Sequence, residues 1–146
     1  AAVKCWIHNR KLYIEAEAGG VGVEIDQTAD LVLEKMPDAA AHAIRADNAR
    51  PESISYLKRN GLPRITACAK GKGSVEDGVA HIKSYDEVVI HPRCKATANE
   101  FLLYSYKTDR LSGDILPVLV DENNHWIDSL RYALEPVMKK RKSTFG

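Results

Sequence analysis

The stretch HAIRADNARPESISYLKRNG, residues 42–61, joins a short apolar run to an amphipathic segment through a polar turn. Residues 42–46 predict a β-strand. Pro51 favours the first turn of a helix, and the Asn-Gly pair that ends at Gly61 is typical of a helix C-terminus. The stretch therefore predicts a strand, a turn and a helix, with Asp47 at the carboxyl end of the strand.

The same alternation continues along the chain. Residues 64–69 and 87–90 predict strands, and residues 74–84 between them carry Val and Ile at helical spacing. Strands that alternate with helices are typical of a parallel α/β sheet. Three further helices are predicted, over residues 24–36, 97–104 and 125–140.

Two hairpins are also predicted. Apolar and polar side chains alternate on both sides of residues 8–11, which indicates an antiparallel hairpin over residues 1–19. Residues 104–107 and 114–120 predict a second, outer hairpin. Because the first strand is already under way at Ala1, with no turn or cap before it, we expect residues that belong to the fold to lie upstream.

The composition limits the classes of protein. A chain of 146 residues with 45% hydrophobic content is long enough for one domain with its own core. Its 21 basic and 20 acidic residues exclude a polycation, so a contact with nucleic acid must come from local clusters. Three cysteines without a CxxC pair argue against a disulfide framework and a zinc site, and favour a reducing compartment. No apolar run approaches the roughly 20 residues that span a bilayer, so we expect a soluble protein without a membrane partner.

Two carboxylates are candidates for a functional site. Asp47 follows a predicted strand at its carboxyl end, where open α/β sheets bind their ligands. Asp128 borders the apolar stripe of the last helix, where an acid is unusual. Each also has a structural explanation, since Asp47 would cap the next helix or form an Asx-turn. Asp128 would interact with the helix dipole or pair with Arg131.

Four segments, ADNARPESISYLKRNG, KGKGSVEDGVAHIK, IHPRC and NNHWIDSLRYAL, occur in this order. Together they resemble the C-terminal nuclease domain of the large terminase subunit of tailed bacteriophages, and the resemblance spans nearly all of residues 1–146. It implies an RNase H-like α/β fold, with a mixed β-sheet flanked by helices on both faces and with its first strand absent from these residues. It also implies a metal-dependent endonuclease that cleaves concatemeric viral double-stranded DNA during genome packaging.

The resemblance further implies an acidic triad that holds two Mg²⁺ or Mn²⁺ ions. Asp47 matches the second acid and Asp128 the third, whereas the first is expected on a strand before Ala1. Such ions lie about 3.5–4 Å apart, activate a water and stabilise the leaving 3′ oxygen, and they require a bridging carboxylate. We therefore expect the present residues alone to bind metal weakly and to cut poorly.

Other polar residues have weaker claims. His125, one turn before Asp128, would orient a water or contact a phosphate, although a His in this position more often caps or packs. Asp121 is a candidate for an outer metal shell. Three other acids are expected to face solvent: Glu15, Glu17 and Asp26.

Contacts with DNA are expected from basic side chains beside the carboxylates, because phosphate neutralisation supplies most non-specific affinity. Lys70 and Lys72 lie in a glycine-rich loop after the strand 64–69, and the helix N-terminus that follows suits a phosphate. Arg50 is a second candidate. Each of these, like the basic run 139–142, is also explained as a solvated surface charge.

The resemblance implies partners beyond DNA, namely the portal protein and the terminase small subunit of the packaging motor, in the host cytoplasm. No ATPase motif occurs, so ATP-driven translocation is expected of a separate N-terminal domain. Two alternatives are a nuclease-dead DNA-binding or docking module of the motor, and a resolvase-like nuclease that cleaves branched DNA.

Overall fold

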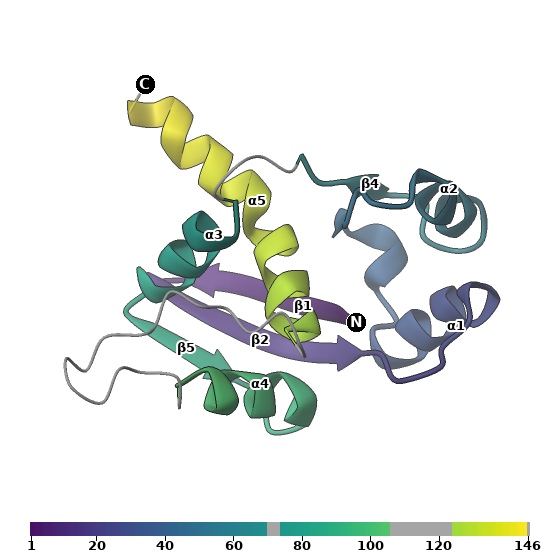
Figure 1. Cartoon of the computed structure of the whole chain (residues 1–146), viewed down its shortest axis with the longest axis horizontal. Coiled ribbons are helices and arrows are strands. Elements are labelled where there is room, and N and C mark those ends of the chain that lie inside the picture. Colours follow the sequence, from purple (N-terminus) through teal and green to yellow (C-terminus); the bar gives the residue numbers. More distant parts are fainter. Residues whose placement is uncertain (70–73, 106–123, 146) are drawn as a thin grey trace.

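The structure is a computed structural model that describes residues 1–69, 74–105 and 124–145 (Figure 1). The strands are β1 (Ala2–His8), β2 (Lys11–Ala18), β3 (Ile44–Ala46), β4 (Ile65–Ala67) and β5 (Glu87–Ile90). The helices are α1 (Ile25–Lys35), α2 (Pro51–Arg59), α3 (Ser74–Lys83), α4 (Lys95–Ser105) and α5 (His125–Phe145), with a short 3-10 helix over Ala39–Ala41. The predicted βα unit is confirmed as β3 followed by α2.

The described strands form two sheets. One has the order β1-β2-β5, in which β1 pairs antiparallel with β2, and β2 pairs parallel with β5. The other is the parallel pair β3-β4. Strand β1 is therefore an edge strand, and β3 also keeps one unpaired edge within the described part of the chain.

The predicted first hairpin is confirmed, with its turn at Asn9 and Arg10. Both residues have positive φ, 50° and 63°, as a tight turn between antiparallel strands requires. The alternation of β2 buries Leu12, Ile14, Ala16 and Ala18 on one side. This periodic burial is what the sequence pattern predicted.

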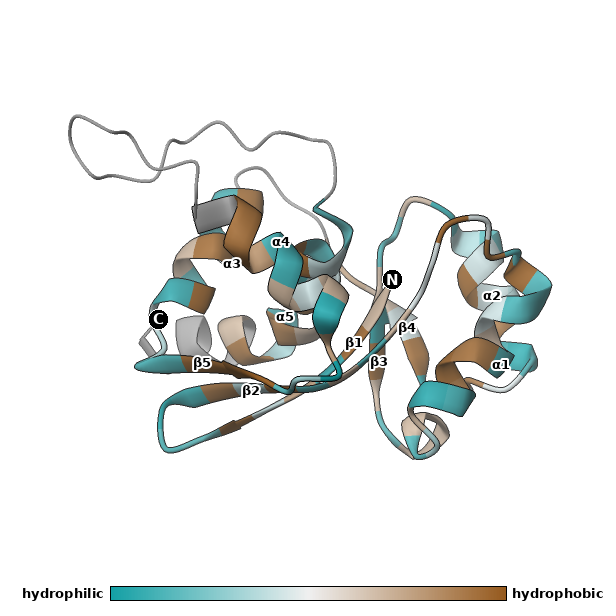
Figure 2. Cartoon of the chain, turned by 90° about the horizontal axis from the view of Figure 1, so that it is seen from below, coloured by the Kyte–Doolittle hydropathy of each residue, from teal (hydrophilic) through white to brown (hydrophobic). Residues whose placement is uncertain are grey.

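Two hydrophobic clusters make up the core. The first joins the end of β2 to α1 and to the β3-β4 pair, with Val32, Leu62 and Ile65 at its centre. The second joins the start of β2 to α5, and Leu130 is fully buried in it. Figure 2 shows α3, α4 and α5 on one side of the β1-β2-β5 sheet, with α1 and α2 beyond β3 and β4. Helix α5 contacts both β1 and β3, so it bridges the two sheets.

Some predicted boundaries need correction. Tyr104 and Ser105 belong to α4 and do not start a strand, because the helix continues past the predicted end. The remainder of the second predicted hairpin, within 106–120, lies outside the described residues. Helix α5 extends to Phe145, so the basic run 139–142 is helical.

Helix α4 begins on a carboxylate that comes from another element. Glu17 of β2 accepts the backbone N–H groups of Ala96 and Thr97 in the first turn of α4, at 2.9 and 3.2 Å. This corrects the expectation that Glu17 faces solvent, since the first N–H groups of a helix need acceptors.

No helix in the described residues is long and apolar enough to cross a bilayer.

Candidate functional site

A groove of about 660 Å³ is lined by β1, by the segment around β3 and by the start of α5. Its walls include residues 1–6, most of which belong to β1, and residues 42–47 around β3. Helix α5 contributes one turn-spaced set of side chains: His125, Asp128, Ser129 and Tyr132. Both candidate carboxylates, Asp47 and Asp128, line this groove although they lie 81 residues apart in the sequence (128 − 47).

Asp47 lies immediately after β3 and is exposed. Its Oδ1 accepts the backbone N–H of Ala49 at 3.1 Å, which is the Asx-turn that the sequence left open as a structural role. Asp47 is not the cap of α2, because Arg50 occupies that position and no side chain caps the helix there. The Asx-turn holds one oxygen of this groove-lining carboxylate.

Asp128 lies in the first turn of α5, and its backbone N–H donates to the carbonyl of Asn124 at 2.8 Å. Its Oδ1 accepts a hydrogen bond from Arg131 Nη2 at 2.7 Å, so the ion pair that the sequence offered as an alternative is present. The Arg131 side chain is 8% exposed and that of Asp128 is 38% exposed. The pair therefore anchors one carboxylate oxygen on a buried guanidinium.

The buried position of Arg131 depends on Gly78 in α3. A Cβ added at Gly78 would lie 2.5 Å from Arg131 Cδ and 2.8 Å from Cγ. A glycine in a helix interior is unfavourable by about 1 kcal/mol relative to alanine. Here the missing side chain leaves the space through which the arginine reaches Asp128.

The start of α5 is held by Glu100 of α4, which is 7% exposed. Its carboxylate accepts the backbone N–H groups of Trp126 and Ile127, at 3.0 and 3.1 Å. Desolvation by burial raises the pKa of Glu100 above its ordinary value, while these N–H donors and His125 oppose the rise. No local pattern predicts this role, because Glu100 becomes buried only when α5 packs against α4.

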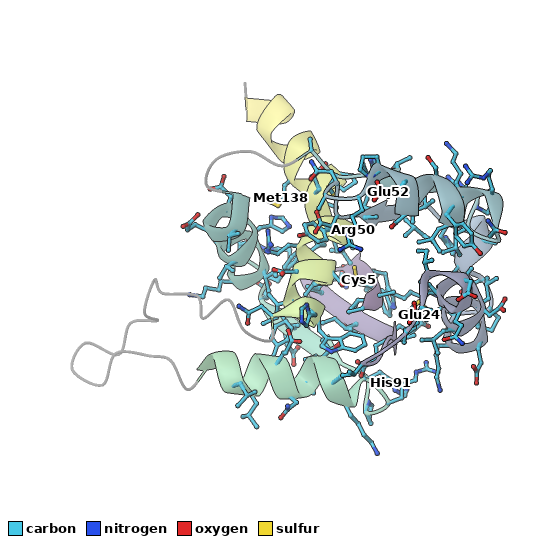
Figure 3. The ribbon with its side chains drawn as sticks, turned by 45° about the vertical axis from the view of Figure 1, so that its right-hand side comes forward. Cys5, Glu24, Arg50, Glu52, His91 and Met138 are labelled. Carbon is cyan, nitrogen blue, oxygen red and sulfur yellow. The ribbon has the colours of Figure 1, made fainter. Side chains whose placement is uncertain are left out.

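The other predicted residues are distributed as follows. His125 is the first residue of α5, is exposed and lines the groove. Arg50 is exposed, and Figure 3 shows it between α5 and the α2 side of the molecule. Lys70, Lys72 and Asp121 lie outside the described residues.

The sequence analysis did not single out three groove residues: Lys4, Cys5 and Arg45. Lys4 Nζ contacts Glu15 at 2.8 Å and Asp38 at 2.7 Å, and hydrogen bonds to Asp38 and Glu15 raise the pKa of Lys4. Burial raises the pKa of the Cys5 thiol to about 11. Alternation along β1 and β3 was the only signal for these residues, and it does not say that the two strands face one groove.

The donor set suits a hard divalent cation only in part. Two carboxylates from separate elements provide the oxygen ligands that Mg²⁺ and Mn²⁺ prefer. Arg131 bonds to Oδ1 of Asp128, and the aspartate side chain is 38% exposed, so a metal can reach the carboxylate. Within residues 1–69, 74–105 and 124–145, however, no group of three or more His, Cys, Asp or Glu side chains is placed to hold an ion. The two acids therefore fit as part of a metal site.

The chain is similar to known phage proteins. It is 42% identical over 120 residues to the terminase large subunit of Bacillus phage SPP1, covering 81% of this chain and 28% of that protein. It thus spans less than a third of the length of this relative. Its structure is also similar to the crystal structure of the nuclease domain of the SPP1 large terminase, g2p, with bound Mn. That comparison has a TM-score of 0.80 at 36% identity, over 93% of this chain and 77% of the other.

These similarities agree with a match to a family model. The model describes the terminase RNase H-like domain, and it matches residues 2–136. The predicted RNase H-like fold is therefore confirmed, and so is the resemblance to the nuclease domain of the phage terminase large subunit. The chain belongs to the terminase RNase H-like domain family.

Proposed function

We propose that this domain is the metal-dependent endonuclease of a phage packaging motor, and that it cleaves concatemeric double-stranded viral DNA. The observation that carries the proposal is the presence of Asp47 and Asp128, from two separate elements, on one groove. The similarity to a nuclease domain whose crystal structure contains Mn supports the same conclusion.

In this proposal Asp47 and Asp128 hold Mg²⁺ or Mn²⁺, and two such ions act together in the intact site. When bound, the ions supply a nucleophilic water and neutralise the charge on the leaving 3′ oxygen. The Asx-turn holds Asp47 in place, and Arg131 fixes one oxygen of Asp128. His125 lines the same groove one turn before Asp128, and we propose that it orients a water or a phosphate oxygen.

A two-ion site needs a further acid, and the groove suggests how it is supplied. Strand β1 and strand β3 each have an unpaired edge within the described chain, and both edges border the groove. An extended segment laid along β1 would pair with it and bring its side chains beside Asp47 and Asp128. We propose that an acid on such a strand completes the triad.

DNA is the proposed substrate, with Arg50, Lys70 and Lys72 as phosphate contacts. Arg50 is exposed and occupies the N-cap position of α2, three residues after Asp47, which supports its assignment as a phosphate contact near the proposed metal site. The portal protein and the terminase small subunit are proposed as partners, in the host cytoplasm during packaging. The similarity to a terminase large subunit supports this context.

The metal site is tested by titrating the protein with Mn²⁺ and recording the free ion by electron paramagnetic resonance. Asp47→Asn and Asp128→Asn should each weaken Mn²⁺ binding by at least tenfold, because each removes a charged ligand at constant size. Asp26→Asn, the same change on an exposed acid of α1, is the matched control and should have no effect. Unchanged Mn²⁺ binding in both groove variants would contradict the metal site.

Cleavage is tested separately on supercoiled plasmid. A protein that carries further N-terminal residues, including the strand with the missing acid, should nick plasmid in Mn²⁺ or Mg²⁺ and lose this activity in EDTA. Residues 1–146 alone should nick weakly. Asp47→Asn and Asp128→Asn should abolish nicking by the longer protein, and full activity in either variant would count against the assignment.

One observation favours a second candidate for the chain as it stands. The described residues hold no cluster of three potential metal ligands, which suits a DNA-binding or docking module that does not cut. This candidate predicts DNA binding without nicking, and it predicts the same for the longer protein.

A further inference from the structure

The first turn of α5 is capped by a side chain from a different helix. Oε1 of the buried Glu100, in α4, accepts the backbone N–H of Trp126 at 3.0 Å and that of Ile127 at 3.1 Å. Because α5 begins at His125, these are its second and third N–H groups, which an N-cap side chain ordinarily accepts. Glu100 therefore caps α5 from outside the helix.

The capped turn carries two residues of the candidate site. His125 precedes Trp126, Asp128 follows Ile127, and both His125 and Asp128 line the groove. Since a helix turns by about 100° per residue, the rotation of this turn sets the directions in which both side chains leave it. A bond that fixes the N–H groups between them also fixes those directions.

Other contacts of the same turn act on side chains. Ser129 Oγ donates to the carbonyl of Ala1 at 2.8 Å. The Trp126 ring lies against Gly19, where an added Cβ would be 3.0 Å from the ring. Arg131 bonds to the carboxylate of Asp128. Glu100 complements these contacts because it acts on the backbone of the helix.

We infer that Glu100 is a positioning residue of the nuclease site, which orients the metal ligand Asp128 by capping the helix that carries it. This inference rests on the proposed function, since it requires Asp128 to bind the metal. Without the cap, the first turn would lose the acceptor of two N–H groups, and Asp128 would lose its fixed direction. Groups that orient metal ligands change metal affinity ten- to a hundredfold when they are substituted.

The test records Mn²⁺ binding by electron paramagnetic resonance and the melting temperature of the same variants. Glu100→Ala should weaken Mn²⁺ binding about tenfold, because it removes the acceptor. Glu100→Gln keeps an oxygen that can accept both N–H groups, and it should bind Mn²⁺ as the wild type does. Glu100→Leu fills the buried space without an acceptor, and it replaces the Ala variant if that variant does not fold.

The matched control is Glu17→Ala. Glu17 caps α4 in the same way, through the N–H groups of Ala96 and Thr97. Its loss should lower the melting temperature and leave Mn²⁺ affinity unchanged, because α4 carries no proposed metal ligand.

Three results would overturn the inference. The first is wild-type Mn²⁺ affinity in folded Glu100→Ala or Glu100→Leu. The second is an equal loss in Glu100→Gln, because the negative charge would then act on the ion directly. The third is an equal loss in Glu17→Ala, because lower stability would then explain the effect. Unchanged Mn²⁺ binding in both Asp47→Asn and Asp128→Asn contradicts the proposed metal site itself, and the inference then falls with it.

Discussion

Arg131 donates from Nη2 to Oδ1 of Asp128 at 2.7 Å, and the two residues lie three apart in the first turns of α5. The arginine is almost fully buried, whereas the aspartate is partly open to the groove. The side chain that is proposed to hold a metal is therefore also the partner of a buried charge. Substitutions of Asp128 must separate these two roles.

Asp128→Ala should lower the free energy of unfolding by about 2 kcal/mol, because it leaves a buried guanidinium without its carboxylate. Asp128→Asn keeps an oxygen acceptor and should cost about 1 kcal/mol or less. Urea unfolding of both variants measures the difference. An Asp128→Ala variant as stable as the Asn variant would mean that the pair contributes little to the fold.

Gly78→Ala should destabilise the protein, although the same change in an ordinary helix interior stabilises by about 1 kcal/mol. The added methyl group would meet the Arg131 stem, which is held at one end by the backbone and at the other by Asp128. Melting temperatures of Gly78→Ala, Arg131→Ala and the double variant form a cycle.

The control for this prediction lies within the cycle. In the Arg131→Ala background the methyl group has room, so Gly78→Ala should there raise the melting temperature. If Gly78→Ala is stabilising in both backgrounds, the close approach of Gly78 and Arg131 does not exist in solution.

Glu100→Gln should change how stability depends on pH. The pKa of Glu100 is raised in the folded protein, so the folded state holds the proton more tightly than the unfolded state does. Its contribution to stability is therefore present below the ordinary value of 4.5 and is lost as pH rises through the raised pKa. Urea midpoints measured between about pH 4 and 8 should fall less with pH in Glu100→Gln than in wild type. Exposed Glu34→Gln should follow the wild type.

Local patterns in the sequence were enough to predict the hairpin, the βα units and the last helix. Each depends on residues that are close in sequence, such as the alternation around Leu12 and Ile14 or the helical spacing through Leu130 and Leu134. Helix α4 was predicted too short, because the pattern after Leu103 suits either a helix end or a strand start. The pairing of β2 with β5 joins residues about 76 apart (Leu12 and Val88), which no local pattern encodes.

The site was predictable only as far as single residues carry a signal. Asp47 and Asp128 were found from their positions at a strand end and on an apolar helix face, and the family resemblance assigned their roles. Arg131 was foreseen only as a possible partner of Asp128, and Gly78 was not assigned, because the role of both comes from α3 and α5 lying against one another. The groove itself is a relationship between two strand edges and has no sequence motif.

Cys5 offers a direct measurement of the groove in solution. Its thiol lines the groove between β1 and β3, and burial raises its pKa to about 11, against an ordinary value of 9.0. At a pH below both values the thiolate fraction, and with it the alkylation rate, should be about a hundredfold lower than for an ordinary thiol, since each pKa unit is a factor of ten.

Iodoacetamide labelling, followed residue by residue with peptide mass spectrometry, separates Cys5 from the buried Cys68 and Cys94. The rate should rise about tenfold per pH unit and continue to rise above the ordinary pKa. If the labelling rate of Cys5 stops rising near pH 9.0, as the rate of an ordinary thiol does, labelling occurs from an opened groove. Burial in the closed groove then does not set the pKa of Cys5.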